Sequence, residues 1–343
     1  MNHSSPPANR RSMFGHQGLW TPAIRLLRTM SFPAKASIVM VLMLIPMAVL
    51  GWSYFTAAIA QVEIAQNERL GVAYVKAMLV LQENVQIVRG QAGRGTIPPA
   101  SQQQLDDAYK ALQQVEQASG KELETSEAFS KLGPALNKAR TAAPAAMREV
   151  FVEVVEALDE LRDQAALGSG LTLDPDADSY NLMAAIVDHV PSLGEAIALM
   201  RSTGASVLAS GKFEGNQRDV FVRQMAMLDH HSGEIAKHFE QVVKANAALK
   251  PVVKSDETLA PVKAIDRFIE TNILGELKAG DGEAFRTQVT EVIAGLHTAN
   301  RRLLDVLDGL LAARIDGFHA KELQIAFMLV VTLALALYIF TGF

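Results

Sequence analysis

Three arginines are the side chains of this sequence best suited to hold a ligand. Arg89, Arg94 and Arg201 each lie at or near the end of a segment that is predicted to be a long helix. A guanidinium group is planar and permanently charged, and its paired N–H donors match a carboxylate or a phosphate. These arginines are therefore the candidates for contact with a small anion. The alternative is that they pair with acids of neighbouring helices or point into solvent.

A run of acidic residues has the spacing of a calcium loop but lacks its other requirements. Asp174, Asp176 and Asp178 occupy the places of oxygen ligands 1, 3 and 5. Position 6 is Ser179 instead of Gly, and position 12 is Ala185 instead of Glu. The glycine makes the sharp turn of an EF-hand and the glutamate closes its coordination shell, so this class of site is excluded.

The same acidic run has a local interpretation as the start of a helix. Asp174 is a good N-cap residue, and Pro175 is favoured at the first helical position. The carboxylates of Asp176 and Asp178 would then face the positive end of the helix dipole. In the alternative interpretation, Asp174 and Asp178 contact a ligand or an ion together with Tyr180.

The histidines do not predict a metal site. His230 and His231 are adjacent, so on a helix their side chains point about 100° apart. His238 follows seven or eight residues later, and His189 belongs to another helix. We expect these residues to be solvated or to lie at the edge of a helix seam, with no metal bound.

No catalytic constellation is present in the sequence. It contains no phosphate-binding loop, no nucleophile elbow and no H-E-x-x-H motif. The chain has no cysteine, which excludes disulfides, thiolate metal sites and a cysteine nucleophile. We therefore expect neither an enzyme nor a cofactor.

The sequence predicts an all-α fold. Aromatic residues make up only 6% of the chain, and strong helix formers dominate. Three segments show apolar or small residues at alternating spacings of four and three, as in helices packed at shallow angles. These seams are Met147, Phe151, Val154, Leu158, Leu161 and Ala165; Phe221, Met225, Leu228, the polar exception Ser232, Ile235, Phe239 and Val242; and Phe285, Val289, Val292, Leu296, Ala299, Leu303, Val306, Leu310 and Ala313.

Two uncharged segments predict transmembrane helices at residues 36–57 and 325–343. Each is about as long as the roughly 20 residues that cross a bilayer. Residues 1–35 carry five basic residues and no acidic one, which places this tail in the cytoplasm by the positive-inside rule. The alternatives are a signal peptide cleaved near residues 58–60 and a tail that binds nucleic acid. The basic leader and the apolar run are both long for a signal peptide, which disfavours cleavage. A membrane span accounts for the basic tail without nucleic-acid binding.

Residues 58–324 then form a helical-bundle domain between the two spans. A single four-helix bundle would use only part of this length, so we expect an elongated bundle, with two stacked four-helix modules. A weak internal duplication agrees with two modules. Tyr74 precedes Arg89 by 15 residues, and Tyr180 precedes Arg201 by 21 residues. In both cases small residues follow the arginine.

Several segments resemble the sensor region of proteobacterial methyl-accepting chemotaxis proteins. They are Glu68-Arg-Leu-Gly-Val-Ala-Tyr74 with Val88-Arg89-Gly90, Leu171-Thr-Leu-Asp-Pro-Asp-Ala-Asp-Ser-Tyr-Asn-Leu-Met183 with Val190-Pro191, and Leu337-Tyr-Ile-Phe-Thr-Gly-Phe343. The resemblance covers residues 36–343. Similar input regions also occur in membrane histidine kinases and diguanylate cyclases. The signalling domain that follows the second span in such families is not part of this sequence.

The resemblance implies a receptor of the bacterial inner membrane whose central domain lies in the periplasm. It would be a homodimer that binds a small, possibly anionic, molecule between helices and relays the signal through the second membrane helix. Arg89, Arg94, Arg201, Tyr74, Asp174, Asp178 and Tyr180 are the candidate ligand contacts. Cytoplasmic signalling partners are expected only if the native chain extends past residue 343, and nucleic acid is not expected as a partner. A membrane-anchored helical scaffold is the alternative from another class.

Overall fold

The computed structural model describes residues 28–142 and 146–342, apart from the side chains of residues 147 and 148. Within these ranges the chain is helical and contains no strand, which confirms the all-helical class. The chain divides into two compact units. We call Gln61–Phe318 the bundle unit, and Met1–Ala60 together with His319–Phe343 the apolar unit. The predicted basic tail lies largely outside the described residues, as does Phe343.

Two helices of 61 residues belong to both units, namely α2 (Phe32–Ala92) and α11 (Gly282–Gly342). Each contains an apolar window that is long enough to span a membrane and is not buried within the protein. Ala177–Ser210 is a third candidate by length and composition, where the sequence predicted only two. However, 72% of its apolar window is buried. Its apolar side chains therefore contribute to a protein core.

In the apolar unit the two long helices present apolar side chains outward. Met43, Leu50 and Phe327 are among the large exposed residues. A methyl group added to Gly51 would lie 3.6 Å from a methyl carbon of Leu329, so the two segments are in close proximity there. An apolar surface of this extent requires a nonpolar environment, and a lipid bilayer supplies one.

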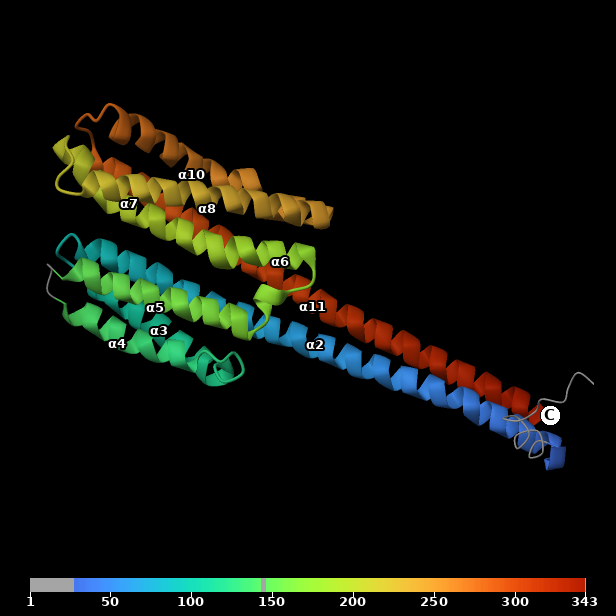
Figure 1. Ribbon diagram of the computed structural model, residues 1–343. Coiled ribbons are helices and arrows are strands. Elements are labelled where there is room, and N and C mark those ends of the chain that lie inside the picture. The colour runs from blue at the N-terminus through green and yellow to red at the C-terminus, as the bar shows by residue number, and fades with distance from the viewer. Residues whose placement is uncertain (1–27, 143–145, 343) are drawn as a thin grey trace, which may run out of the picture. The chain divides into compact units, whose positions relative to one another are not determined.

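The bundle unit contains two groups of roughly antiparallel helices (Figure 1). The first group joins α2 to α3 (Pro99–Ser119), α4 (Ser126–Thr141) and α5 (Met147–Gly168). In α3, α4 and α5 apolar residues recur at the helical period among polar ones, so each of these three helices buries one face. Fully buried leucines from three of them meet in the core: Leu112, Leu132 and Leu161.

The second group joins α11 to a long helical run and two further helices. The run is α6 (Ala177–Met183), the π-helix η2 (Ala184–His189) and α7 (Val190–Ser210); the others are α8 (Gln217–Ala245) and α10 (Ser255–Ile269). Short helical segments connect these elements: η1 (Leu171–Leu173), η3 (Ala247–Leu249), α9 (Lys250–Val253) and the π-helix η4 (Glu270–Gly275). One hydrophobic cluster extends through both groups.

The predicted seams of α5 and α8 form the buried faces of those helices. Every apolar seam residue from Phe151 to Ala165 and from Phe221 to Val242 is buried, and the polar exception Ser232 is partly buried. In α11 the predicted heptad seam is only partly correct. Phe285, Val289, Leu296 and Leu303 are buried, but Val292, Ala299, Val306 and Leu310 are only partly buried and Ala313 is exposed. The buried stripe shifts to Ile293, Leu304 and Leu307. A helix of 3.6 residues per turn drifts from a strict heptad, and α11 has neighbours on more than one side.

Proline explains the π-helix η2. Pro191 has no N–H to donate to the carbonyl four residues earlier, and its ring crowds that carbonyl. The Val190 N–H donates instead to the carbonyl of Ala185, five residues back. Such a π-turn inserts one extra residue and changes the direction in which its side chains point. The side chain of His189 lies at this position.

Candidate functional site

Arg89 forms a two-pronged ion pair with Glu195. The arginine lies near the end of α2, and the glutamate lies on α7. Arg89 Nη2 donates to Glu195 Oε2 at 2.9 Å, and Nη1 donates to Oε1. Gln86 Nε2 donates to the same Oε2 at 3.2 Å. Only about a sixth of each charged side chain is exposed, at 17% and 16%, so this pair is well shielded from solvent.

Arg201 lies nearby on α7, and its hydrogen-bond acceptors in the described part of the chain are neutral. Its Nη1 donates to Thr290 Oγ1 on α11 at 3.2 Å, and its Nη2 donates to the backbone carbonyl of Gln86 at 3.4 Å. Among the residues that the structure describes, no carboxylate forms an ion pair with Arg201. Withdrawing a charged group from water costs free energy that a paired opposite charge normally offsets, and Arg201 has no such pair among the described residues.

The electrostatic surroundings of Arg201 are positive. Burial, and after it the charges of Arg89, Arg286 and Arg94, lower the pKa of Arg201 to about 10. Glu195 opposes this shift only weakly. The three arginines that were predicted from sequence are therefore close enough in the structure to influence one another.

Gly90 allows Arg201 to approach α2. A Cβ atom at position 90 would lie 2.7 Å from Arg201 Nη2, which is closer than real Cβ contacts. Arg94 follows in the turn after α2 and is exposed. Arg89 pairs with Glu195, whereas Arg94 and Arg201 form no ion pair within the described part of the chain. The cluster of Arg89, Arg94 and Arg201, which we call the arginine cluster, thus carries more positive than negative charge.

A buried histidine completes the link from this cluster to α11. His297 Nε2 donates to Gln86 Oε1 at 3.0 Å, and burial lowers the pKa of His297, which favours its neutral form. Gln86, Glu195 and His297 were not predicted from the sequence. One signal was available, because Glu195 is the only charged residue in the apolar run 190–200.

Tyr74 lies in the core of the first helix group. Its side chain is completely buried, and its hydroxyl donates to Glu116 Oε2 at 2.8 Å. Burial raises the pKa of the Tyr74 phenol. Thr125 and Ser126 donate to the same carboxylate. The structure therefore does not bring Tyr74 together with the arginine cluster.

Asp174 is part of a buried network around Arg314 of α11. Arg314 Nη2 donates to Asp174 Oδ1 at 2.7 Å, and Nη1 donates to Glu68 Oε2 at 2.9 Å. Ser179 Oγ accepts a third bond from Arg314 at 2.6 Å. Asp176 Oδ2 lies 2.6 Å from Arg314 Nε. Three carboxylates thus surround one guanidinium group. We call Arg314 together with Glu68, Asp174, Asp176 and Ser179 the Arg314 network.

The predicted helix start at Asp174 is wrong by two residues. Helix α6 begins at Ala177, and Asp176 occupies the N-cap position. The Asp174 carboxylate accepts the N–H of Asp176 at 2.9 Å in a turn and also binds Arg314. The tertiary ion pair with Arg314 therefore fixes the Asp174 side chain in place of a helix cap.

The other two predicted contacts lie beside this network. Asp178 Oδ2 accepts a bond from Asn246 Nδ2 at 2.9 Å, and its Oδ1 accepts the N–H of Ser179. Tyr180 is 40% exposed. These residues and Asp174 form a set separate from the arginine cluster, so the candidate contacts are divided among three places.

The excess of carboxylates affects Glu68 most strongly. This residue has no exposed surface. Burial, followed by the negative charge of Asp174, raises the pKa of Glu68 to about 7, although Arg314 opposes the shift. Glu68 can therefore gain or lose its proton near neutral pH.

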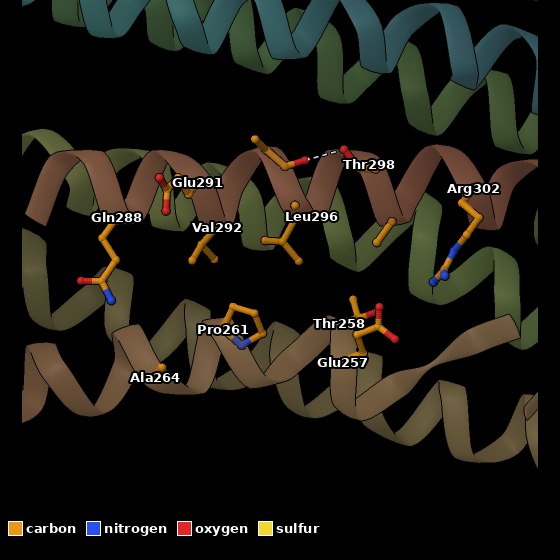
Figure 2. Close-up of a pocket in the computed structure, with 13 residues that line it drawn as sticks. Glu257, Thr258, Pro261, Ala264, Gln288, Glu291, Val292, Leu296, Thr298 and Arg302 are labelled. Carbon is orange, nitrogen blue, oxygen red and sulfur yellow. Dashed lines mark hydrogen bonds between the residues drawn. The ribbon is translucent and has the colours of Figure 1, made fainter. Parts of the chain in front are cut away.

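A separate groove of about 720 Å³ lies between α10 and α11. Figure 2 shows Val292 and Leu296 of α11 pointing across it toward Pro261 of α10. Glu257 and Arg302 line one end. None of the residues predicted to bind a ligand lines this groove.

No family model, no curated protein and no solved structure matches this chain. The resemblance to chemoreceptor sensor regions therefore rests on the sequence segments alone. The charge and packing of the described side chains provide the remaining information about function.

Proposed function

We propose that this chain is the input region of a bacterial transmembrane receptor of the chemoreceptor type, and that the arginine cluster binds a small anion such as a carboxylate. The observation that carries the proposal is Arg201, a mostly desolvated guanidinium group with neutral acceptors and neighbouring positive charges. An anion placed beside Arg201 and Arg94 would supply the missing countercharge.

A ligand with two adjacent acceptor oxygens is energetically favoured at Arg201. Hydrogen bonds between ionised partners are about twice as strong as neutral ones, and a guanidinium group can donate two in parallel. The bonds that Arg201 now makes, at 3.2 and 3.4 Å, are long and end on neutral oxygens. Exchanging these weak bonds for bonds to a carboxylate supports binding without any loss of an existing ion pair.

The same contacts provide a means of relaying the binding event. Arg201 bonds Thr290 of α11 and the Gln86 carbonyl of α2. Both helices continue without interruption into apolar segments. A ligand that draws Arg201 away from these acceptors would alter the packing of α7 against α2 and α11. Such a relay needs two packings of similar energy and a ligand that prefers one of them.

In this proposal the apolar segments of α2 and α11, predicted at residues 36–57 and 325–343, are the two membrane spans, and the bundle unit lies in the periplasm of a homodimer. The basic residues that precede α2 support a cytoplasmic N-terminus. The third candidate, Ala177–Ser210, is assigned to the bundle because most of its apolar window is buried.

The test is thermal unfolding of the full chain in lipid nanodiscs with acetate, succinate, citrate, phosphate or sulfate added in turn. We expect at least one of these anions to raise the unfolding temperature, and Arg201→Gln to abolish the increase. At a hundredfold excess over Kd, binding stabilises the folded state by about 2.7 kcal/mol.

Arg223→Gln is the matched control, because Arg223 is an exposed arginine of α8 outside the cluster. It should leave the anion effect unchanged. An effect that persists in Arg201→Gln, or the absence of any effect with all five anions, would contradict the proposed site.

A further inference from the structure

Four of the eight histidines of the chain gather at one place in the bundle unit. His189 ends the π-helix η2, and His230, His231 and His238 lie on α8. The ring of His189 is central, with centroid distances of 6.0, 5.4 and 5.5 Å to those three rings. From the sequence these residues were predicted to be solvated or to lie at a seam edge, because the packing of η2 against α8 is a tertiary contact that sequence spacing does not reveal.

Two sets of three possible metal ligands result within the part of the chain that the structure describes. One set is His189, His230 and His231, and the other is His189, Glu234 and His238. In each set one donor atom per residue lies within 4.8 Å of the donors of the other two. Tetrahedral ligands at about 2.0–2.1 Å from a metal are roughly 3.4 Å apart, so small side-chain rotations would close either set.

Hydrogen bonds orient the second set for metal binding. His238 Nδ1 lies 2.9 Å from Asn181 Oδ1 and donates to it, which leaves the lone pair of Nε2 available. That Nε2 is 3.9 Å from Glu234 Oε2, one helical turn earlier on the same face of α8. A ring nitrogen held by an outer hydrogen bond is the usual arrangement of a metal-binding histidine.

His231 can play the corresponding role for His189. The two Nδ1 atoms are 3.1 Å apart, so one of them donates to the other. When His189 Nδ1 is the donor, its Nε2 is left as the free ligand atom. His231 then carries its own proton on Nε2, a buried atom without a hydrogen-bond partner. His231 is thus a positioning residue in this arrangement.

The protonation states suit a cation. Burial is the largest cause that lowers the pKa of His189, His231 and His238, and the value for His231 falls to about 4. The pKa of Glu234 is lowered, chiefly by its hydrogen bond from Lys237. The ligands are therefore neutral imidazoles and a carboxylate at neutral pH.

Two cations oppose binding of an ion here. Lys237 pairs with Glu234 at 2.9 Å, but the lysine side chain is 63% exposed and can turn away into solvent. The positive charge of Arg162 contributes to the lowered pKa of His231, but Arg162 is itself paired with Asp159 and Asp163. Neither cation therefore blocks the space between Glu234 and His238.

We propose that His189, Glu234 and His238 bind a divalent first-row transition-metal ion, with Zn²⁺ as the representative case. Two imidazoles and one carboxylate suit Zn²⁺, Ni²⁺, Co²⁺ or Cu²⁺, whereas Ca²⁺ and Mg²⁺ prefer a shell made of oxygen alone. The ion would link the π-helix η2 to α8. This inference does not depend on the proposed anion site.

The experiment uses the full chain in nanodiscs, purified without a polyhistidine tag and carrying His3→Ala and His16→Ala to remove two histidines of the N-terminal tail. Zn²⁺ affinity is measured by competition with a chromophoric chelator, and Co²⁺ absorption reports the coordination. We expect one equivalent of tightly bound metal. His238→Ala and His189→Ala should each weaken Zn²⁺ binding at least about tenfold, and Glu234→Gln should also weaken it.

His230→Ala and His319→Ala are the matched controls, because His230 belongs to the other ligand set and His319 lies outside the bundle unit. Both should bind Zn²⁺ as the parent does. Loss of binding in His230→Ala with retention in His238→Ala would overturn this ligand set, and so would the absence of a tight site in the parent. The unfolding temperatures of all variants test whether misfolding causes a loss of binding. Because the Glu234 side chain is partly exposed, Glu234→Gln is the variant that should disturb folding least.

Discussion

Arg201 and Arg314 are both largely withdrawn from solvent in the bundle unit, but their surroundings have opposite charge. Arg201 is placed among other arginines, its acceptors among the described residues are neutral oxygens, and its pKa is lowered to about 10. Arg314 is surrounded by the carboxylates of Glu68, Asp174 and Asp176, and its pKa is raised.

The difference shows how one residue type can serve two purposes in one fold. Arg314 completes a buried network, and both of its Nη groups already donate to carboxylates. Arg201 has donors that lack charged acceptors, so it retains the capacity to bind an external anion. Whether a buried arginine indicates a ligand site therefore depends on whether its N–H donors already have charged acceptors.

Removing the two charges should separate these roles most clearly. Arg314→Met leaves Glu68 and Asp174 as buried carboxylates without a countercharge, and we expect a loss of about 3–5 kcal/mol in the free energy of unfolding. Arg201→Met removes a desolvated charge that has no carboxylate partner, so its cost should be within about 1 kcal/mol. Chemical unfolding of both full-length variants in the same micelles measures this contrast. Equal losses would mean that Arg201 is also a structural residue.

The arginine cluster contacts α11 at Thr290, and Arg314 lies further along the same helix. Leu303 lies between these two positions. Its side chain is fully buried. Leu303→Pro removes a helix hydrogen bond and should cost about 3 kcal/mol. We also expect it to stop an anion at Arg201 from changing the distance between spin labels at Leu50→Cys and Leu333→Cys in the apolar unit. The chain has no cysteine of its own, so these labels are specific.

Leu303→Ala is the control for that variant, because it loses about 2–5 kcal/mol through a cavity and keeps the helix intact. It should preserve the anion-dependent distance change. If Leu303→Pro preserved it as well, α11 would not be the path of the signal.

The Arg314 network should also differ from the arginine cluster in its response to pH. The pKa of Glu68 is raised to about 7 from its ordinary 4.5, so the folded state holds a proton that the unfolded state has released. This contribution to stability is complete below pH 4.5 and is lost as the pH rises through 7. Glu68→Gln should flatten the decline in unfolding temperature between pH 6.5 and 8. His189, His231 and His238 are already neutral there, because their pKa values are lowered. An undiminished decline would assign it to another group.

Sequence periodicity was sufficient to predict the helices and most of the core. The apolar residues of the seams from Phe151 to Ala165 and from Phe221 to Val242 are buried as predicted. Their burial could be predicted because the spacing of apolar residues along one helix is a local property of the sequence. Such spacing could not establish which helices are neighbours. The segment 177–210 illustrates this limit, since its composition is that of a membrane span and its burial is that of a core helix.

The arginine cluster was predictable in its residue types but not in its electrostatics. Arg89 and Arg94 are neighbours in sequence, and only the packing of α7 against α2 adds Arg201 to them. Asp174 shows the opposite case. A sound local rule predicted a helix cap there, and an ion pair with Arg314, 140 residues later in the chain, determined the outcome instead.

The smallest expected effect concerns the acid that lies within the arginine cluster. Glu195 occupies both Nη groups of Arg89 and thus competes with an external anion. Glu195→Gln should tighten anion binding roughly three- to tenfold, equivalent to about 0.6–1.4 kcal/mol. Calorimetric titration with the anion that stabilises the parent measures this change. Glu283→Gln, which removes the exposed partner of Arg286, should leave the affinity nearly unchanged. Weaker binding in Glu195→Gln would instead mean that Glu195 holds Arg89 in the orientation that the anion requires.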